Sequence, residues 1–468
     1  MSPTNNTTFD ITSPFDESVI ATLDTTDRGT ALAALGRAHA LYEDRAHWLD
    51  APRRIAILES FAKLITARTD ELARQAAHEG GKPLKDSLVE VVRAIDGVGV
   101  AVREIAQLHG TEIPMGLNAA SMHCAAYTYR EPRGVVLAIS AFNHPFNLII
   151  HQAVTAIAAG CPVLVKPALN TSLSAKSVVE LLIEAGLPEG WCQLILCDNA
   201  TTEELVGDPR IAYMTFIGSA KVGWYLRSKL APGALCALEH GGVAPVIVDA
   251  TADLDAAVAP LVRGGFYHAG QVCVSVQRIY VEASVAEQFA DKFVAAVSEL
   301  TTGDPLDPST DVGPLIWPRE VERLESWVAE AVSGGAELLT GGKRITNTTF
   351  SPTVLLNPPD DAKISQHEVF GPVVALYTFE DLDEAIRRAN ALDVFFQAAV
   401  FTRDLDTALG TSRRLNGTAV MVNDHTAFRV DWMPFGGHRQ SGLGMGGIGY
   451  SMRDMTLERM VVFHSGEL

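Results

Sequence analysis

The sequence predicts an α/β protein built around a doubly wound parallel sheet. Between residues 134 and 248, short runs rich in β-branched residues alternate with segments of helical length. Repeated β-α units with short connections place helices on both faces of a parallel sheet. A second series of helices and strands follows Gly242, which predicts a second α/β region. The 468 residues, 47% of them hydrophobic, are enough for two or three domains.

The N-terminal region is predicted to be mainly helical. A turn and a short strand are expected over residues 14–20. Apolar spacing typical of helices follows over 26–46 and 52–79, up to the turn Gly80-Gly81-Lys82-Pro83, and again over 88–108. Residues 112–131 are predicted to be extended.

The two α/β regions come next. The first has expected strands at 134–140, 162–166, 193–197, 211–216, 234–238 and 245–248, with helices at 145–159, 172–185, 201–205 and 219–230. The second has expected helices at 254–264, 285–300 and 318–332, with strands at 353–356, 373–378, 398–401 and 419–422. Open parallel sheets bind ligands at the carboxyl ends of their strands. Near the C-terminus, the apolar run 460–463 would be an exposed edge on a monomer, so we expect it to pair with another subunit.

Composition excludes several classes of function. The net charge of −19 opposes binding to nucleic acid or to an anionic membrane surface. No apolar run approaches the roughly 18 residues of a membrane helix, and Met1–Asp10 lacks the features of a signal peptide. The six cysteines are too sparse for a disulfide framework and form no C-x-x-C pair. A cytoplasmic protein with reduced thiols and no bound metal ion is therefore expected.

Two residues 34 positions apart suggest chemistry, because each lies close to glycine. Glu239 is part of Leu238-Glu239-His240-Gly241-Gly242, and Cys273 ends Gly270-Gln271-Val272-Cys273. Glycine allows the backbone to turn sharply or to approach a ligand closely, so these side chains could project into a cleft. A buried structural cysteine and a solvated glutamate are the alternatives.

Three predicted strands end in further candidates. Gly218 lies between a strand and a helix, where free N–H groups can bind a pyrophosphate, although the G-x-G-x-x-G pattern is missing. Lys166 ends another strand and could reach a ribose or phosphate, unless it is simply solvated. Asn143 follows a third strand, and its amide could donate to an oxyanion or merely satisfy its own turn.

Together these motifs resemble the aldehyde dehydrogenase superfamily over nearly the whole chain. The match comprises Phe142-Asn143-His144-Pro145, Lys166-Pro167, Gly218-Ser219, Leu238-Glu239-His240-Gly241-Gly242, Gly270-Gln271-Val272-Cys273, Glu368-Val369-Phe370-Gly371-Pro372, Pro434-Phe435-Gly436-Gly437 and Ser441-Gly442. Each motif alone is common, but the ordered set is specific.

The resemblance implies a fold with a Rossmann-like nucleotide-binding domain, a catalytic domain and a small β oligomerisation element. Residues 1–108 and 128–241 are expected to bind the nucleotide, and 242–445 to form the catalytic domain. Residues 109–127 and 446–468 are expected to supply oligomerisation strands and a tail. A homodimer or homotetramer is expected.

The resemblance also implies the oxidation of an aldehyde to a free acid. Cys273 would attack the aldehyde carbon, and Asn143 together with the Cys273 N–H would hold the oxyanion. After hydride transfer, Glu239 would activate the water that hydrolyses the thioester. Glu239 argues against the coenzyme-A-acylating branch, which lacks this base. A non-catalytic binding protein on the same scaffold is the third hypothesis, which the presence of all three residues disfavours.

NAD or NADP is the implied cofactor. The residues that the resemblance assigns to it are Ser140, Phe142, Lys166, Gly218, Ser219, Gly241, Glu368 and Phe370. Members devoted to NAD usually carry a glutamate three residues after the lysine, where this chain has Leu169. Its absence makes NADP possible and slightly favoured, although Asp198 in a nearby loop could oppose a 2′-phosphate. Met445-Gly446 replaces the Arg-Glu of many relatives, which puts a secondary proton relay to Glu239 in doubt.

The expected aldehyde tunnel is unusually polar. Candidate substrate residues are Arg93, His144, His151 and Arg429, a set that favours an anionic aldehyde through charge-assisted hydrogen bonds. Val272 stands where several relatives that act on phosphorylated aldehydes have arginine, so carboxylate, sulfonate and phosphate groups all remain possible. A surface arginine or a satisfied core histidine is the alternative for each residue.

Overall fold

The predicted α/β fold with a doubly wound parallel sheet is confirmed. The computed structural model describes residues 7–468; residues 1–6, where the polar stretch Met1–Asp10 begins, lie outside the described residues. A six-stranded sheet has the order β19-β9-β8-β5-β6-β7. Its strands are β5 (Val135–Ile139), β6 (Val163–Lys166), β7 (Cys192–Leu194), β8 (Ile211–Ile217), β9 (Leu235–Glu239) and β19 (Gly442–Leu443).

The strand order explains where ligands can bind. The chain runs outward from β5 to β6 and β7, then returns to β8 and β9 on the other side of β5, all in parallel pairing. The short strand β19 adds an antiparallel edge beside β9. The carboxyl ends of β5 and β8 therefore lie at a topological switch point, where open α/β sheets leave a crevice.

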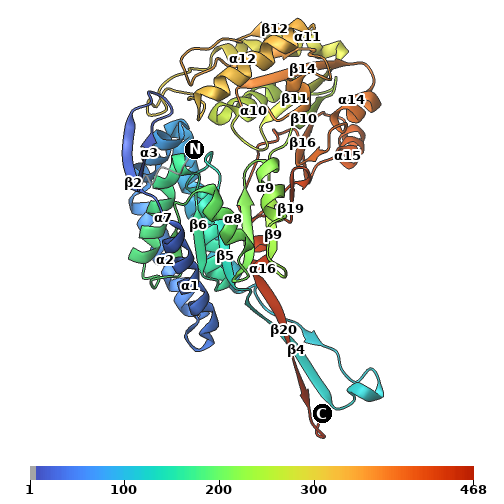
Figure 1. Cartoon of the computed structure of the whole chain (residues 1–468). Helices are drawn as coiled ribbons and strands as arrows, with labels where there is room; N and C mark the ends of the chain where they lie inside the picture. The colour runs from blue at the N-terminus through green and yellow to red at the C-terminus, as the bar shows by residue number, and fades with distance from the viewer. Residues whose placement is uncertain (1–6) are drawn as a thin grey trace.

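Helices cover this sheet on its two faces (Figure 1). They are α1 (Arg28–Glu43), α2 (Ala51–Ala67), α3 (Thr69–Gly80), α4 (Leu84–Ile105), α7 (Ser172–Glu184), α8 (Asn199–Gly207) and α9 (Ala220–Arg227). The apolar spacing of 52–79 forms two helices, because Arg68 leaves the helical conformation with φ −119° and ψ 20°. The expected helix 145–159 is α5 (Asn147–Ile149), a π-helical turn over Ile150–Val154 and α6 (Thr155–Ala159).

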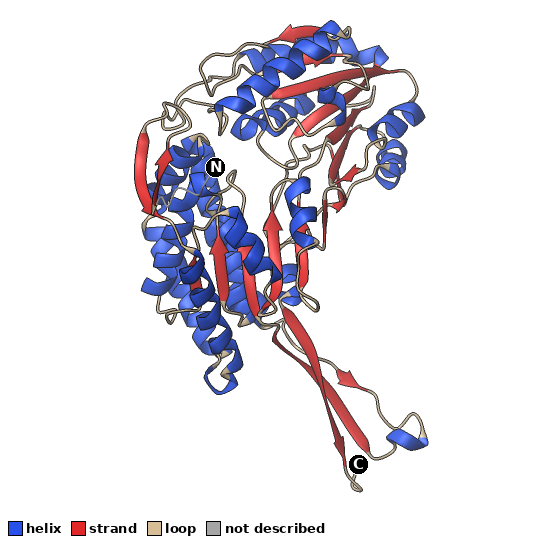
Figure 2. Ribbon diagram, in the orientation of Figure 1, coloured by secondary structure: helices blue, strands red, loops and turns tan. Residues whose placement is uncertain are grey.

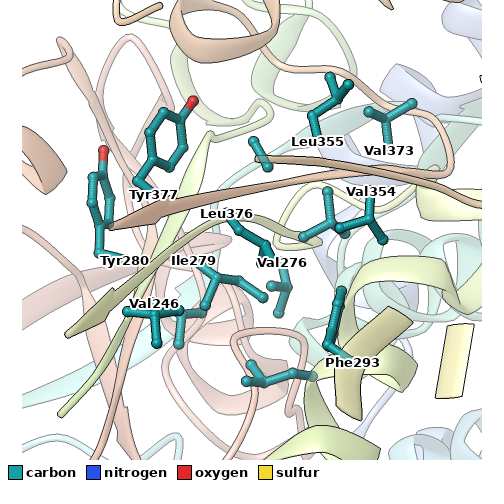
Figure 3. Packing of buried hydrophobic residues seen from close by; sticks show 14 of the residues in the cluster. Val246, Val276, Ile279, Tyr280, Phe293, Val354, Leu355, Val373, Leu376 and Tyr377 are labelled. Atoms are coloured by element: carbon teal, nitrogen blue, oxygen red, sulfur yellow. The ribbon is translucent and has the colours of Figure 1, made fainter. Parts of the chain in front are cut away.

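The second region is a seven-stranded sheet of order β12-β13-β14-β11-β10-β16-β17. Its strands are β10 (Ala244–Val248), β11 (Val276–Glu282), β12 (Glu337–Thr340), β13 (Thr353–Leu356), β14 (Val373–Phe379), β16 (Gln397–Phe401) and β17 (Ala419–Val422). The helices around it are α10 (Leu254–Phe266), α11 (Ala283–Ser298), α12 (Pro318–Ser333), α14 (Leu382–Ala389) and α15 (Leu405–Arg414). Side chains such as Val246, Ile279 and Leu376 pack from neighbouring strands against Phe293 of α11 (Figure 3).

A long β ribbon projects from the body of the molecule (Figure 2). It consists of β4 (Cys124–Pro132) and β20 (Thr456–His464), with the short β3 (Glu112–Ile113) beside β4. One edge of the run 460–463 pairs within the chain, since Met460 lies opposite Thr128. Pairing of this run with another subunit stays a prediction. The other edge of β20 remains an outer edge of its sheet. None of the helices within residues 7–468 has the length and apolar character needed to cross a bilayer.

The remaining elements are small. Strands β1 (Thr8–Thr12) and β2 (Val19–Asp24) form a hairpin, and β15 (Val394–Phe395) pairs with β18 (His438–Arg439). Helices α13 (Lys363–Gln366) and α16 (Ile448–Asp454) complete the chain, with α16 packed against α4 and α6.

Candidate active site

A cleft of about 980 Å³ is lined by the loops that follow the strands of both large sheets. Asn143 enters it after β5, Gly218 after β8 and Glu239 at the end of β9, while Cys273 lies in the loop that leads into β11. A cleft of this volume matches the size of a typical small-molecule site. Residues far apart in the sequence therefore meet where the strand order predicts a ligand.

The thiol of Cys273 and the carboxylate of Glu239 are in direct contact. Cys273 Sγ donates to Glu239 Oε1 across 3.5 Å. The backbone N–H of Gly242 donates to the Cys273 carbonyl at 3.0 Å, which ties the two segments together. A nucleophile and a base within hydrogen-bond reach form the basic unit of nucleophilic catalysis.

The backbone before Cys273 has a special shape. His268, Ala269 and Gly270 have φ values of 49°, 54° and 70°, so three consecutive residues are left-handed. Non-glycine residues adopt this conformation at a cost and keep it only where their surroundings enforce it. The side chain of Gln271 provides such support: its amide donates to the Pro314 carbonyl at 3.2 Å and its oxygen accepts from Ile316 N at 3.0 Å.

The amide of Asn143 points at the nucleophile loop. Its Nδ2 donates to the carbonyl of Gln271 at 2.9 Å, and the side chain is buried. A buried amide donor beside a nucleophile can stabilise the negative oxygen that forms when a carbonyl is attacked. In the resting site this donor is occupied by Gln271, so it must turn to a substrate oxygen.

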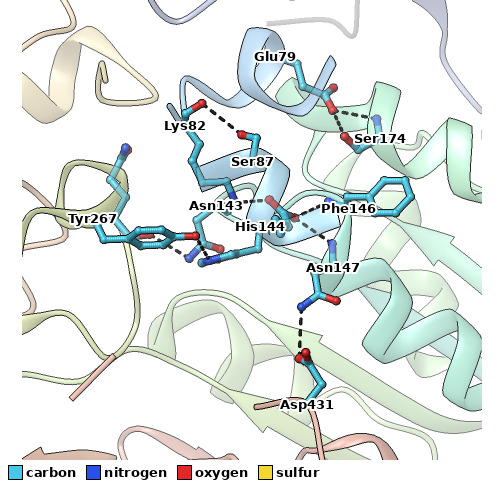
Figure 4. A network of polar contacts seen from close by, with 12 residues as sticks. Glu79, Lys82, Ser87, Asn143, His144, Phe146, Asn147, Ser174, Tyr267 and Asp431 are labelled. Carbon is cyan, nitrogen blue, oxygen red and sulfur yellow. Dashed lines mark hydrogen bonds and ion pairs between the residues drawn. The ribbon is translucent and has the colours of Figure 1, made fainter. Parts of the chain in front are cut away.

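A buried ion pair holds the turn that carries Asn143 (Figure 4). Lys82 and Glu90 are both completely buried and pair with each other. Lys82 Nζ also donates to the Asn143 carbonyl at 3.3 Å. Glu90 Oε1 accepts from the N–H groups of Phe146 and Asn147, each at 2.9 Å. Through these hydrogen bonds the pair holds residues 143–147 at both ends, which fixes the position of the Asn143 amide.

Removing one partner of this pair should destabilise the fold strongly. Glu90→Ala leaves the Lys82 charge buried without its partner, and we expect the free energy of unfolding to fall by about 3–5 kcal/mol. Chemical denaturation measures the change. Glu184→Ala, which removes an exposed partner of Arg68, is the matched control and should cost less than about 1 kcal/mol. Equal losses in the two variants would contradict this account.

Burial raises the proton affinity of the reacting pair. The pKa of the Cys273 thiol lies well above its usual value because of burial and the neighbouring Glu239 carboxylate. Burial also raises the pKa of Glu239, which Arg429 partly offsets. The resting site therefore holds a protonated thiol next to a carboxylate that binds protons more readily than usual, which suits transfer between them.

The other end of the cleft fits a dinucleotide. Among residues 7–468, the hydroxyl of Ser140 and Glu368 Oε1 are buried without a hydrogen-bond partner, so both are available to a ligand. A Cβ at Gly241 would lie 1.8 Å from Glu368 Oε1, so only glycine allows this close approach. Gly218 and Ser219 precede α9, and Lys166 ends β6. Burial raises the pKa of Glu368 to about 8.

Two arginines lie at the substrate end of the cleft, and only one of them is neutralised by an ion pair. Arg93 Nη2 donates to Asp431 Oδ1 at 2.7 Å, and Arg93 Nε donates to Asp431 Oδ2 at 3.2 Å. His151 Nε2 lies 2.7 Å from the same carboxylate. Arg429 has neither an ion pair nor a hydrogen bond with any residue in 7–468, and its Nε is buried. Its guanidinium lies 3.6 Å from the centre of the Phe435 ring. Arg429 is thus the available cation.

All the predicted site residues except His151 line the main cleft. The π-helical turn over Ile150–Val154 carries His151, which lines a separate cavity of about 40 Å³ behind Glu239. His144 does face the cleft, 3.5 Å from the Tyr267 hydroxyl. Burial lowers the pKa of His144 well below its usual value, so this ring is neutral near pH 7.

Sequence reasoning missed several residues of the site. Asp431 is not among the residues predicted from the sequence. Its position two residues after Arg429 is a signal that a cation of the site is neutralised. Asn147 donates to Asp431 at 3.4 Å and carried no motif. For the Lys82–Glu90 pair, the turn Gly80-Gly81-Lys82-Pro83 is the only signal in the sequence. Nothing in the sequence indicates that Glu90 is the partner of Lys82.

Comparisons with known proteins agree with this geometry. Residues 1–461 match the model of the Aldehyde dehydrogenase family. The chain is 38% identical over 454 residues to 3-sulfolactaldehyde dehydrogenase of Priestia aryabhattai, covering 96% of this chain and 93% of that protein.

Two solved structures are similar over nearly their full length. Aldehyde dehydrogenase 21 from Physcomitrella patens, in complex with the reaction product succinate, has a TM-score of 0.95 at 34% identity and covers 100% of this chain and 97% of that one. Glyceraldehyde-3-phosphate dehydrogenase from Methanocaldococcus jannaschii, complexed with NADP, has a TM-score of 0.93 at 34% identity, covering 99% and 100%.

Proposed function

The chain belongs to the aldehyde dehydrogenase family and is an NAD(P)-dependent enzyme, and we propose that it oxidises a small anionic aldehyde to the free carboxylic acid through a thioester on Cys273. The observation that carries the proposal is the contact between Cys273 Sγ and Glu239 Oε1 beside the Asn143 amide. The names of its relatives, which act on sulfolactaldehyde or are bound to succinate, support an anionic substrate.

The reaction begins with proton transfer from the thiol. Cys273 gives its proton to Glu239 as Sγ forms a bond to the aldehyde carbon, and the carbonyl electron pair moves to oxygen. The Asn143 amide leaves the Gln271 carbonyl and donates to that negative oxygen. The Lys82–Glu90 pair keeps the turn in place while the amide changes partner. A thiohemiacetal results.

The second half converts the thiohemiacetal into the acid. When bound, the nicotinamide supplies a hydride acceptor, and oxidation leaves a thioester on Cys273. Ser140, Gly218, Ser219 and Glu368 would hold the dinucleotide. Once Glu239 has released its proton to solvent, it takes a proton from the attacking water. The carbon–sulfur bond then breaks, and Sγ leaves as the acid is released.

Arg429 would bind the charged end of the substrate. It is half-buried, forms no ion pair or hydrogen bond within residues 7–468, and lines the same cleft as Cys273. Arg93 and His144 line the cleft near Arg429. His151 does not line it and contacts Asp431, the carboxylate that binds Arg93. A half-buried guanidinium with free donors is suited to a carboxylate or sulfonate, because charge-assisted hydrogen bonds are about twice as strong as neutral ones.

NADP is proposed as the preferred nucleotide. Three residues after Lys166 the chain has Leu169, which cannot accept from the ribose hydroxyls and does not repel a 2′-phosphate. The carboxylate of Asp198, which could oppose a phosphate, caps α8 by accepting from Thr201 N at 2.7 Å. The capping role gives Asp198 a structural function, and Leu169 is the feature that supports NADP over NAD.

Assembly through the β ribbon is proposed as well, in a cytoplasmic homodimer or homotetramer. No strand in the described part of the chain pairs with the outer edge of β20, and the side chains Met460, Val462 and Phe463 are about half exposed. An open apolar edge of this kind is covered in most proteins. A second copy of the ribbon would cover it.

A direct assay tests the proposed function. Succinic semialdehyde and the neutral butanal are each incubated with NAD and with NADP, in the presence and absence of coenzyme A. We expect succinate as the product without coenzyme A, faster turnover of the anionic aldehyde and a higher kcat/KM with NADP. Formation of an acyl-coenzyme A would favour the acylating alternative, and no reduction of either nucleotide would favour a binding protein.

Replacing Arg429 should affect the two aldehydes differently. In Arg429→Leu the charge-assisted contact, worth about 1.5–3 kcal/mol, is lost, so kcat/KM for succinic semialdehyde should fall roughly 10- to 100-fold. The value for butanal should change little. Arg439→Leu, which removes an exposed arginine, is the control and should affect neither. Equal losses for both aldehydes in Arg429→Leu would contradict the anion site.

A further inference from the structure

Asp431 is buried at the substrate end of the cleft without lining it. Its carboxylate accepts two hydrogen bonds from the Arg93 guanidinium and one from His151 Nε2. Asn147 donates to the same carboxylate (Figure 4). Burial alone would raise the pKa of Asp431, but the His151 hydrogen bond and the nearby cations hold it below its usual range. The carboxylate is therefore charged and neutralises Arg93.

The other titratable groups add little positive charge. Burial lowers the pKa of His151 to about 4, so its ring is neutral and donates Nε2–H to Asp431. His144 is also neutral near pH 7. Arg263 lines the cleft but faces the buried carboxylate of Asp86 at 3.6 Å. Arg93 and Arg263 therefore each form an ion pair, whereas Arg429 forms none within the described residues and interacts with the Glu239 and Asp431 carboxylates only from a longer distance.

The reacting pair contributes no cation either. Cys273 and Glu239 alternate between neutral and negative forms during the reaction. At the substrate end, Arg429 is left as the one cleft-lining arginine among the described residues that forms no ion pair; Lys166, which also lines the cleft, lies at the dinucleotide end. A single negative charge on the substrate balances Arg429. A second negative charge would be desolvated with no partner, which is costly in a buried site.

We propose that Asp431 determines the charge of the accepted substrate: by neutralising Arg93 it makes the cleft specific for an aldehyde with a monoanionic head group, a carboxylate or sulfonate, and excludes a dianionic phosphate. The proposal rests on the proposed function and narrows it. Shape alone would not separate sulfonate from phosphate, since both are tetrahedral with oxygens at the same positions. Charge is therefore the property that distinguishes them.

The test uses three aldehydes of nearly equal size. Sulfoacetaldehyde carries one charge, phosphonoacetaldehyde carries two at mildly alkaline pH, and the methyl sulfone analogue carries none. For the unmodified enzyme we expect kcat/KM for the sulfonate to exceed that for the phosphonate by about 100-fold, because an unmatched like charge is costly. A phosphonate that is oxidised as well as the sulfonate would overturn the proposal without any variant.

Asp431→Asn tests the residue itself. This change keeps an oxygen that can accept from Arg93 or His151 but removes the negative charge, so Arg93 becomes a second unneutralised cation. The ratio of kcat/KM for phosphonate over sulfonate should rise about tenfold or more. An unchanged ratio in a folded variant would overturn the proposal. Asp393→Asn makes the same charge change at an exposed pair with Arg439 and should leave the ratio unaltered.

The sulfone separates this proposal from the proposed function. If the neutral sulfone is oxidised as fast as the sulfonate, the anionic substrate itself is wrong. If both anions are preferred over the sulfone but are not distinguished from each other, the anion site stands and only the role of Asp431 fails.

Discussion

Replacing Cys273 with alanine should abolish aldehyde oxidation. The thiol supplies the only covalent attachment for the substrate in this mechanism, and loss of a nucleophile of this kind lowers kcat by roughly 10⁴-fold or more. The rate of NADPH formation with succinic semialdehyde measures the effect. Binding of NADP, followed by quenching of protein fluorescence, should persist, because no cofactor contact is removed.

A second cysteine provides the control for this variant. Cys124 lies on β4, in the projecting ribbon and away from the cleft. Cys124→Ala should retain full activity. An unchanged rate in Cys273→Ala would show that the thiol is not the nucleophile, and the mechanism would fail with it.

Glu239→Gln should separate the two halves of the reaction. Glutamine occupies the same space but cannot take a proton from water, so hydrolysis of the thioester should slow by roughly 10²- to 10⁴-fold. Hydride transfer depends less on this group, because a thiolate can also form through solvent at alkaline pH. Rapid mixing should therefore give a burst of about one reduced nucleotide per active site, followed by a slow phase.

The absence of a burst would contradict this division of roles. If Glu239→Gln at alkaline pH lost the first turnover as completely as Cys273→Ala, the thiol would have no route for its proton other than the Glu239 carboxylate, and the solvent route would be wrong. If the steady rate were unchanged, another group would be activating the water. Glu282→Gln, on a carboxylate outside the cleft, should behave like the unmodified enzyme.

The sequence predicts the framework of the site well because strand ends have a clear pattern. The β-branched runs ending at Lys166 and Glu239 give β6 and β9, and a parallel sheet brings such ends to one edge. Asn143 and Gly218 follow from the same argument. Their roles in the reaction came from the resemblance and await the experiments above.

The remaining features depend on contacts that no local pattern encodes. Arg93 and Asp431 are 338 positions apart, so their pairing follows from the fold and not from spacing. His151 is predicted from the sequence to line the aldehyde tunnel with His144, but a π-helical turn carries it, and it lines a different cavity. The pairing of Met460 with Thr128 on one edge of β20 could not be predicted, since an apolar strand pairs equally well within a chain or between chains.

Buried charges were the least predictable part of the site. A lysine and a glutamate eight positions apart on either side of a helix start are usually solvated, yet Lys82 and Glu90 are completely buried. Whether such residues are exposed depends on what packs over them. Here the turn that bears Asn143 covers both.

The central claim is a covalent acyl group on Cys273 that Glu239 helps to remove. It is tested most directly by mass spectrometry of Glu239→Gln mixed with succinic semialdehyde and NADP and quenched in acid after the first turnover. The account predicts a succinyl group on the peptide that contains Cys273, and its absence when NADP is omitted. Formation of NADPH with an unmodified Cys273 peptide at every time sampled would contradict it.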